Sequence, residues 1–180
     1  FLPVVALLMA RLVIRAKKWR NLIFVPILLW LSLANLAMHW GHLSQQPQLT
    51  QKSAYVAVWL IVSLIIVIAG RVVPFFTPKA LSITIQALPT WQEKTLIISA
   101  LITNLFLTAR LLGMNIPAWL VSLPVAFITL FSFKRLLHWQ LGRCWGRPLL
   151  WGLHLSYAFI VLGALLWIAS EFQLFATDLA

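Results

Sequence analysis

The sequence of 180 residues contains little charge and very little acid. Charged residues make up 9% of it, and only three residues are Asp or Glu. Soluble globular domains carry about 25% charged residues, so this chain cannot cover a water-exposed surface with polar side chains. A water-soluble fold is therefore excluded. The 62% of apolar residues indicates that the lipid bilayer is the solvent.

Cysteine is almost absent as well. Cys144 is the single cysteine, which excludes an internal disulfide and any C-x-x-C pair for zinc or redox chemistry. No C-x-x-C-H motif is available for covalent haem attachment, so any haem must be held non-covalently. A nucleophilic role for Cys144 is not expected, because no acid-base partner is evident. Hydrolase patterns, such as paired carboxylates or a phosphate-binding glycine loop, are also missing.

Long apolar runs are what the sequence has in abundance. A helix needs about 20 apolar residues to cross about 30 Å of hydrocarbon. Residues 1–14 are apolar up to Arg11 and are expected to be the end of a helix whose beginning is missing. Backbone groups cannot stay unpaired in lipid, so we expect an all-α, polytopic transmembrane helical bundle, with a single transmembrane domain over residues 1–180. The five complete spans are predicted at 22–43, 54–73, 95–112, 116–135 and 149–170.

Lys and Arg are distributed unevenly between alternate connections of these spans. One set of connections holds twelve basic residues, and the other holds only Lys52 and Arg110. Positive residues are retained in the cytoplasm, so the richer set is predicted to face inside. The net charge of +11 thus indicates topology, and no nucleic-acid binding is expected. The inner connection from Pro78 to Trp91 alternates apolar with polar residues and is expected to lie in the plane of the membrane surface.

Polar residues inside the predicted spans are costly and mark candidate sites. His154 and Tyr157 lie three residues apart in the last span and project from one face. The imidazole of His154 either bonds to a neighbouring helix or serves as an axial ligand of haem or copper. Arg71 is either part of an ordinary helix end or a guanidinium that pairs with a buried carboxylate such as a haem propionate.

Two further histidines, His39 and His42, lie at the outer end of the first complete span. With Met38 beside them, they form either a copper site or polar residues in the wet headgroup region. His39 and His154 differ by roughly 18 Å in predicted depth along the membrane normal. An iron reaches only about 2 Å to a nitrogen ligand. These two histidines therefore cannot bind one iron, and two metal roles would need two centres or further ligands.

Two motifs and one longer stretch carry a family resemblance. Residues 70–77 read Gly-Arg-Val-Val-Pro-Phe-Phe-Thr, and residues 148–159 read Pro-Leu-Leu-Trp-Gly-Leu-His-Leu-Ser-Tyr-Ala-Phe. Together with the stretch 21–39, which ends in Asn-Leu-x-x-His, they resemble the NnrS family of polytopic bacterial membrane proteins. The resemblance implies about twelve helices, so further segments are expected on both sides of this chain.

The resemblance also implies a function. NnrS proteins are haem- and copper-containing proteins of the bacterial inner membrane, linked to the nitric oxide response and nitrosative stress. The implied cofactors are non-covalent haem b and copper, and the implied partners are the lipid bilayer and nitric oxide. Whether such a protein turns over, binds or senses nitric oxide stays open. The expected cofactor-binding residues are His154, Tyr157 and Arg71, and the expected metal ligands are His39 and His154.

Two other functions are compatible with the residues. A secondary transporter of a small solute would use Pro124, Asn104 and Arg110 within the spans, although the matching halves typical of such folds are not visible. A non-catalytic membrane assembly factor would need none of the candidate site residues.

Overall fold

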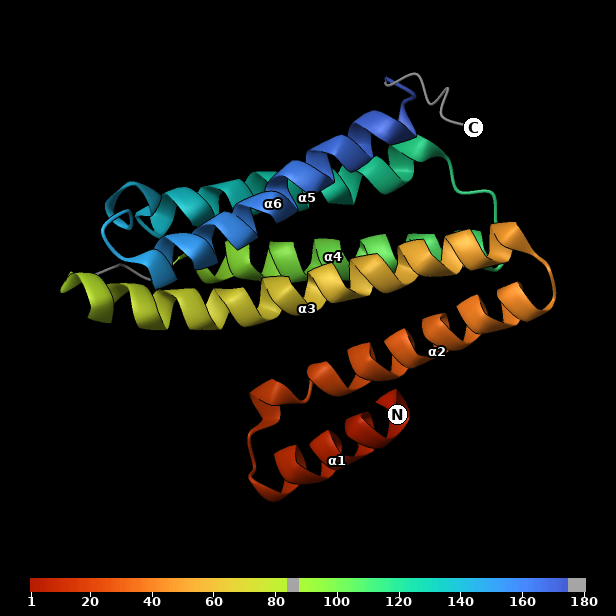
Figure 1. Ribbon diagram of the computed structural model, residues 1–180, viewed down its shortest axis with the longest axis horizontal. Coiled ribbons are helices and arrows are strands. Elements are labelled where there is room, and N and C mark those ends of the chain that lie inside the picture. The colour runs from red at the N-terminus through yellow and green to blue at the C-terminus, as the bar shows by residue number, and fades with distance from the viewer. Residues whose placement is uncertain (84–87, 175–180) are drawn as a thin grey trace. The chain divides into compact units, whose positions relative to one another are not determined.

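A computed structural model describes residues 1–83 and 88–174 of the chain (Figure 1). Within these ranges every regular element is a helix, which confirms the all-α prediction. Two short 3-10 turns, η1 (Trp19–Asn21) and η2 (Leu141–Arg143), lie in connections. The α-helices are α1 (Leu2–Arg15), α2 (Phe24–Leu43), α3 (Pro47–Leu81), α4 (Thr90–Leu111), α5 (Ala118–His138) and α6 (Pro148–Glu171).

Five of these helices, α2 to α6, are long and apolar enough to cross a membrane. Large apolar side chains such as Leu33, Ile98 and Phe159 are about half exposed or more. In water such a surface would be unfavourable, whereas lipid solvates it without cost. The chain is therefore a multi-pass membrane protein.

Helix α3 is longer than the predicted span 54–73, because it begins at Pro47 and continues to Leu81 with Pro74 and Pro78 inside it. The helix therefore does not end at residue 73 as predicted. Proline is tolerated within membrane helices, where neighbouring groups satisfy the backbone carbonyls that lose a partner. The connection from Pro78 to Trp91 was predicted to lie in the plane of the membrane surface, but its first residues, 78–81, belong to α3. Residues 84–87 of that connection lie outside the described part of the chain.

The chain divides into two compact units. The N-terminal unit comprises Phe1–Leu64 with Asn104–Asn115, and the C-terminal unit comprises Ile65–Thr103 with Ile116–Ala180. Helices α3 and α4 each contribute one part to each unit. The expectation that residues 1–180 form a single transmembrane domain stays a prediction.

Helix α4 contacts two other helices of the N-terminal unit through polar side chains. Asn104 is fully buried and donates from Nδ2 to Ser63 Oγ of α3 at 2.8 Å. Thr108 lies one turn further along and accepts from Trp30 Nε1 of α2 at 3.1 Å. In lipid, such bonds between helices stabilise packing that apolar contacts alone leave unspecific. The indole N–H of Trp30, which lies well inside α2, thus has an acceptor on a neighbouring helix.

The turn from α2 to α3 depends on a close approach at Gly41. A Cβ atom on this residue would lie 2.7 Å from Thr50 Oγ1 and 2.8 Å from Thr50 N. The chain reverses through Gln45, which has a φ of 55°, in the left-handed region that few residues adopt. The small residue at position 41 therefore lets the two helices meet directly after the turn.

The C-terminal unit is built on the packing of α5 against α6. Buried residues of α5, including Val121, Val125 and Ile128, recur at helical spacing and form one apolar stripe. The buried stripe of α6 contains two polar residues, His154 and Tyr157, among its apolar ones. Both lie in the core of the unit, where an unpaired polar group is costly. The buried residues of α6 are Leu150, His154, Tyr157, Val161 and Ala164.

Candidate functional site

Arg135 of α5 is the most deeply buried cation described in the C-terminal unit, with 2% of its surface exposed. Its guanidinium forms a bidentate ion pair with Glu93 of α4, in which Nε donates to Oε1 at 2.8 Å and Nη2 donates to Oε2. Nη1 donates to the Ile66 carbonyl of α3 at 2.9 Å and to Tyr157 Oη of α6 at 3.2 Å. One side chain thus connects four helices. Fork-to-carboxylate pairs of this kind are among the stronger polar interactions in proteins.

The guanidinium of Arg135 fits because Gly70 lies beside it. A Cβ atom on Gly70 would lie 2.5 Å from Arg135 Nη2 and 2.9 Å from its Cζ. The first residue of the Gly-Arg-Val-Val-Pro-Phe-Phe-Thr motif is therefore small so that the arginine can approach the backbone of α3.

Tyr157 extends the same polar network. Its hydroxyl accepts from Arg135 and donates to Ser132 Oγ at 3.2 Å. Its ring packs against Trp139 with centroids 4.9 Å apart. These contacts account for a buried tyrosine without a cofactor, so the cofactor-binding role expected for Tyr157 stays a prediction.

His154 is completely buried beside the connection between α5 and α6. Its Nδ1 lies 2.8 Å from the Leu150 carbonyl, and its Nε2 lies 3.2 Å from the Trp139 carbonyl and 3.8 Å from Cys144 Sγ. Each ring nitrogen thus faces a backbone carbonyl that can accept a hydrogen bond from it, and the tautomer decides which nitrogen donates. Histidines that bind metals donate from one ring nitrogen to such a carbonyl and bind the metal through the other.

Cys144 provides a second buried polar side chain beside His154. It is completely buried, and its Sγ lies 3.4 Å from the Gln140 carbonyl. Burial raises the pKa of the Cys144 thiol, because low dielectric surroundings disfavour the thiolate. The free thiol is therefore protonated at neutral pH, and His154 Nε2 lies 3.8 Å from its sulfur.

The packing around His154 does not fit a haem. Both ring nitrogens contact protein atoms, and Trp139 packs edge-on against the ring with centroids 6.1 Å apart. An apolar groove of about 590 Å³ lies nearby between α3 and α6, but His154 does not line it. A porphyrin next to Nε2 would have to displace Trp139 and Cys144.

The other predicted site residues lie elsewhere. Arg71 is half-buried in α3, and the buried arginine fork is Arg135 instead. His39 and His42 are exposed on α2 in the N-terminal unit. Among the residues described, no cluster of three or more His, Cys, Asp or Glu side chains forms. Metal binding by His39, its separation in depth from His154, and a haem contact of Arg71 all stay predictions.

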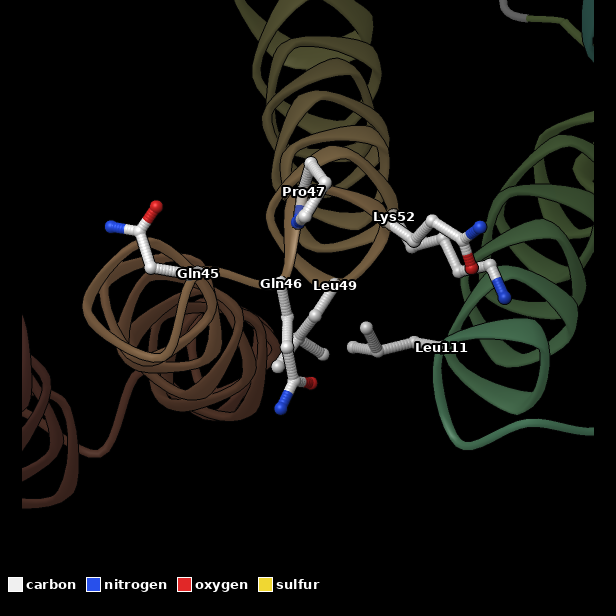
Figure 2. Close-up of a pocket in the computed structure, with 7 residues that line it drawn as sticks. Gln45, Gln46, Pro47, Leu49, Lys52 and Leu111 are labelled. Atoms are coloured by element: carbon white, nitrogen blue, oxygen red, sulfur yellow. The ribbon is translucent and has the colours of Figure 1, made fainter.

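A polar hollow of about 440 Å³ opens beside the turn between α2 and α3 in the N-terminal unit (Figure 2). Glutamines from the turn line it together with Lys52 and Leu111. Figure 2 shows Lys52 extending from α3 toward the end of α4, where Nζ donates to the Arg110 carbonyl at 3.3 Å. Most of the side chains that line the hollow are exposed, and they bring no nucleophile or acid-base pair together.

Sequence reasoning missed Arg135, Glu93 and Cys144. Arg135 was assigned to the basic inner connection because span 116–135 was predicted to end there, whereas α5 continues to His138. The chain has only three acidic residues, so few side chains could pair with a buried cation. This scarcity was the signal that could have pointed to Glu93. The contact of Cys144 with His154 had no signal, because the connection between them has no regular spacing.

Comparison with known proteins gives one finding. The family model described as NnrS protein matches residues 1–180, the whole chain. No curated protein and no solved structure matches it. The match covers both motifs that border the site, the one that opens with Gly70 and the one that contains His154. The chain belongs to the NnrS family.

Proposed function

We propose that this chain is part of a metal-containing protein of the bacterial inner membrane that acts in the response to nitric oxide. Family membership over the full length supports the process, and five helices able to span a membrane support the location. The observation that carries a metal-dependent role is the buried pair of His154 and Cys144. When bound there, copper would supply a one-electron redox centre.

The protein's own residues would prepare this place for a small molecule in three ways. The Leu150 carbonyl orients the His154 ring, and the carbonyl at Trp139 limits its rotation. Trp139 and Tyr157 exclude water, because both are almost completely buried. The Arg135 network holds Tyr157 in place from the other side. Nitric oxide is small and uncharged, so it can reach such a dry site through lipid.

Growth under nitric oxide tests this proposal. A strain that lacks the gene should grow more slowly than the wild type when a nitric oxide donor is added, and equally well without it. The wild-type gene should restore growth, whereas a His154→Gln variant present at equal level in the membrane should not. His138→Gln, with a half-buried histidine in α5, is the matched control and should restore growth. Equal growth of the deletion strain and the wild type would contradict the proposal.

The same strains separate copper from haem. We expect His154→Gln and His138→Gln to carry the same haem absorbance, because the packing at His154 does not fit a porphyrin. Loss of the absorbance in His154→Gln alone would restore the original prediction of a haem ligand. Substrate-dependent flux in liposomes that contain the metal-free protein would instead support a transporter.

A further inference from the structure

We propose that the apolar groove between α3 and α6 holds an acyl chain of an anionic phospholipid, whose phosphate is bound by Lys79 and Arg147. This α3–α6 groove belongs to the C-terminal unit, and on the predicted topology it opens in the inner leaflet of the membrane. His154 and Cys144 do not line it, so a lipid bound there does not depend on the proposed function.

The walls of the α3–α6 groove suit an acyl chain. Val72 and Phe76 form the α3 side, and residues between Pro148 and Ser156 form the α6 side. The volume of about 590 Å³ is in the range of ligand pockets, about 300–1,000 Å³. Among the described residues that line the groove, only Ser156 has a polar side chain, and its hydroxyl donates to the Gly152 carbonyl at 2.8 Å. A polar solute would find few partners there, whereas a hydrocarbon chain needs none.

The length of the groove matches one leaflet. Its α6 side extends from Pro148 to Ser156, which is about 12 Å at the helical rise of about 1.5 Å per residue. One leaflet contributes half of the hydrocarbon core, about 15 Å. Pro148 is the first residue of α6, so the groove starts at the predicted inner surface and extends toward the middle of the bilayer. A single acyl chain that enters beside Pro148 can therefore lie along it.

Basic residues from both walls lie at the inner end of the groove. Arg147 is exposed and directly precedes Pro148. Lys79 is exposed and follows Phe76 by three residues in α3, which places it one turn further along on the same face. Its Nζ lies 3.7 Å from the centroid of the Phe75 ring, a cation–π contact that holds the ammonium beside the helix. Two cations at the end of an apolar groove match the phosphate and the acyl chain of one lipid.

The electrostatics of this end favour an anionic headgroup over a zwitterionic one. Of the two acidic residues in the described part of the chain, Glu93 is bonded to Arg135, and Glu171 ends α6, about 35 Å along the helix from Arg147. The start of α6 has no side-chain cap, so the positive end of the helix dipole adds to the charges of Lys79 and Arg147. A lipid with net negative charge gains from all three sources of positive potential.

Exposed apolar and aromatic side chains place this end of the C-terminal unit among lipid headgroups. Leu149 is 84% exposed, and Trp145 is 72% exposed and stacks on Trp151 with ring centroids 6.4 Å apart. Indole rings are typical of the membrane–water interface, and so large an exposed apolar surface is unfavourable in water. Lipid molecules therefore reach the groove directly from the membrane, which favours a phospholipid over a phosphate ester dissolved in water.

Lipid retention in native mass spectrometry tests the proposal. The purified protein in detergent is titrated with phosphatidylglycerol or with phosphatidylcholine of the same acyl chains, and the lipid-bound fraction is measured. The wild type should bind phosphatidylglycerol more tightly. Lys79→Gln combined with Arg147→Gln should bind it about 25-fold more weakly, since each basic residue near a membrane surface contributes about fivefold. Equal affinity of the wild type for the two lipids would overturn the proposal.

Matched control variants separate the groove from the rest of the surface. Lys17→Gln combined with Lys18→Gln removes the same charge from exposed residues of the N-terminal unit and should leave phosphatidylglycerol binding unchanged. Gly152→Leu should fill the groove, because Gly152 lines it and a Cβ atom there meets no protein atom within 4 Å. It should weaken binding about tenfold, the value of roughly two buried methylene groups. Gly163→Leu, equally unhindered in α6, should have no effect. An equal loss in the control and test variants would overturn the proposal.

Photo-crosslinking of the wild type keeps the test decisive if a variant fails to fold. Phosphatidylglycerol with a diazirine in its acyl chain is incorporated into native membranes, and labelled peptides are identified by mass spectrometry. Residues 72–76 and 149–153 should carry more label than with the matching phosphatidylcholine probe, and more than exposed apolar residues elsewhere in α6, such as Phe159 and Leu165. Even labelling of all these residues would overturn the proposal, and so would labelling that spares the groove because protein covers it.

Discussion

Replacing Glu93 with glutamine should lower the free energy of unfolding by about 3 kcal/mol. The change leaves the Arg135 guanidinium buried without its counter-charge, while its contacts to the Ile66 carbonyl and Tyr157 remain. Breaking a buried ion pair by removing one partner costs about 3–5 kcal/mol. The lower end applies here because the Glu93 side chain is 32% exposed. Unfolding in detergent mixed with increasing SDS, followed by circular dichroism, measures the loss.

Two comparisons show whether charge is the cause. Glu171→Gln removes another of the three acids, near the end of α6, and should change stability by less than about 1 kcal/mol. Adding Arg135→Met to Glu93→Gln should recover much of the loss, because an apolar side chain of similar length replaces the unpaired charge. A double variant as unstable as Glu93→Gln alone would show that the buried charge is not what destabilises the protein.

Gly70→Ala is expected to destabilise the protein by about 1–3 kcal/mol through overpacking. The effect opposes helix propensity, since alanine is better than glycine within a helix by about 1 kcal/mol. The added Cβ would lie 2.5 Å from Arg135 Nη2. Arginine is flexible, but here its guanidinium is held by Glu93, Ile66 and Tyr157, so moving it breaks these hydrogen bonds. The same SDS titration measures the change.

The matched control is Gly163→Ala in α6, where an added Cβ meets no atom within 4 Å. This variant should be neutral or slightly more stable than the wild type. In an Arg135→Ala background, Gly70→Ala should lose its cost, because the clashing guanidinium is gone. An unchanged cost in that background would mean that Gly70 is small for another reason.

The fold was largely predictable because it follows from the solvent. Apolar runs of about 20 residues have one stable conformation in lipid. The five spans, from the one that contains His39 to the one that contains His154, could therefore be located from composition. The full length of α3 could not be predicted in this way. Proline usually ends or kinks a helix in a water-soluble protein, whereas it is tolerated in a membrane helix. Residues after position 73 were therefore assigned to a connection, whereas α3 continues through Pro74 and Pro78 to Leu81.

The candidate site was predictable only in part, because it depends on contacts between helices. The spacing of His154 and Tyr157 placed both on one face of α6, and both are buried in the core of the C-terminal unit. The pattern could not show that Tyr157 faces Arg135 or that His154 faces Cys144. Those contacts bring together residues 22 and 10 positions apart in the chain, which no helical period relates. Arg71 and Arg135 have the same chemistry in the sequence, and only packing distinguishes the one that is fully buried.

X-ray absorption at the copper edge of the purified protein tests the central claim most directly. The protein loaded with one equivalent of copper(I) should show one sulfur and at least one nitrogen in the first shell at bond lengths of about 2.2–2.3 Å and 2.0 Å. Cys144→Ser should lose the sulfur. A wild-type spectrum with nitrogen and oxygen neighbours only would contradict the assignment of the metal to Cys144 and His154.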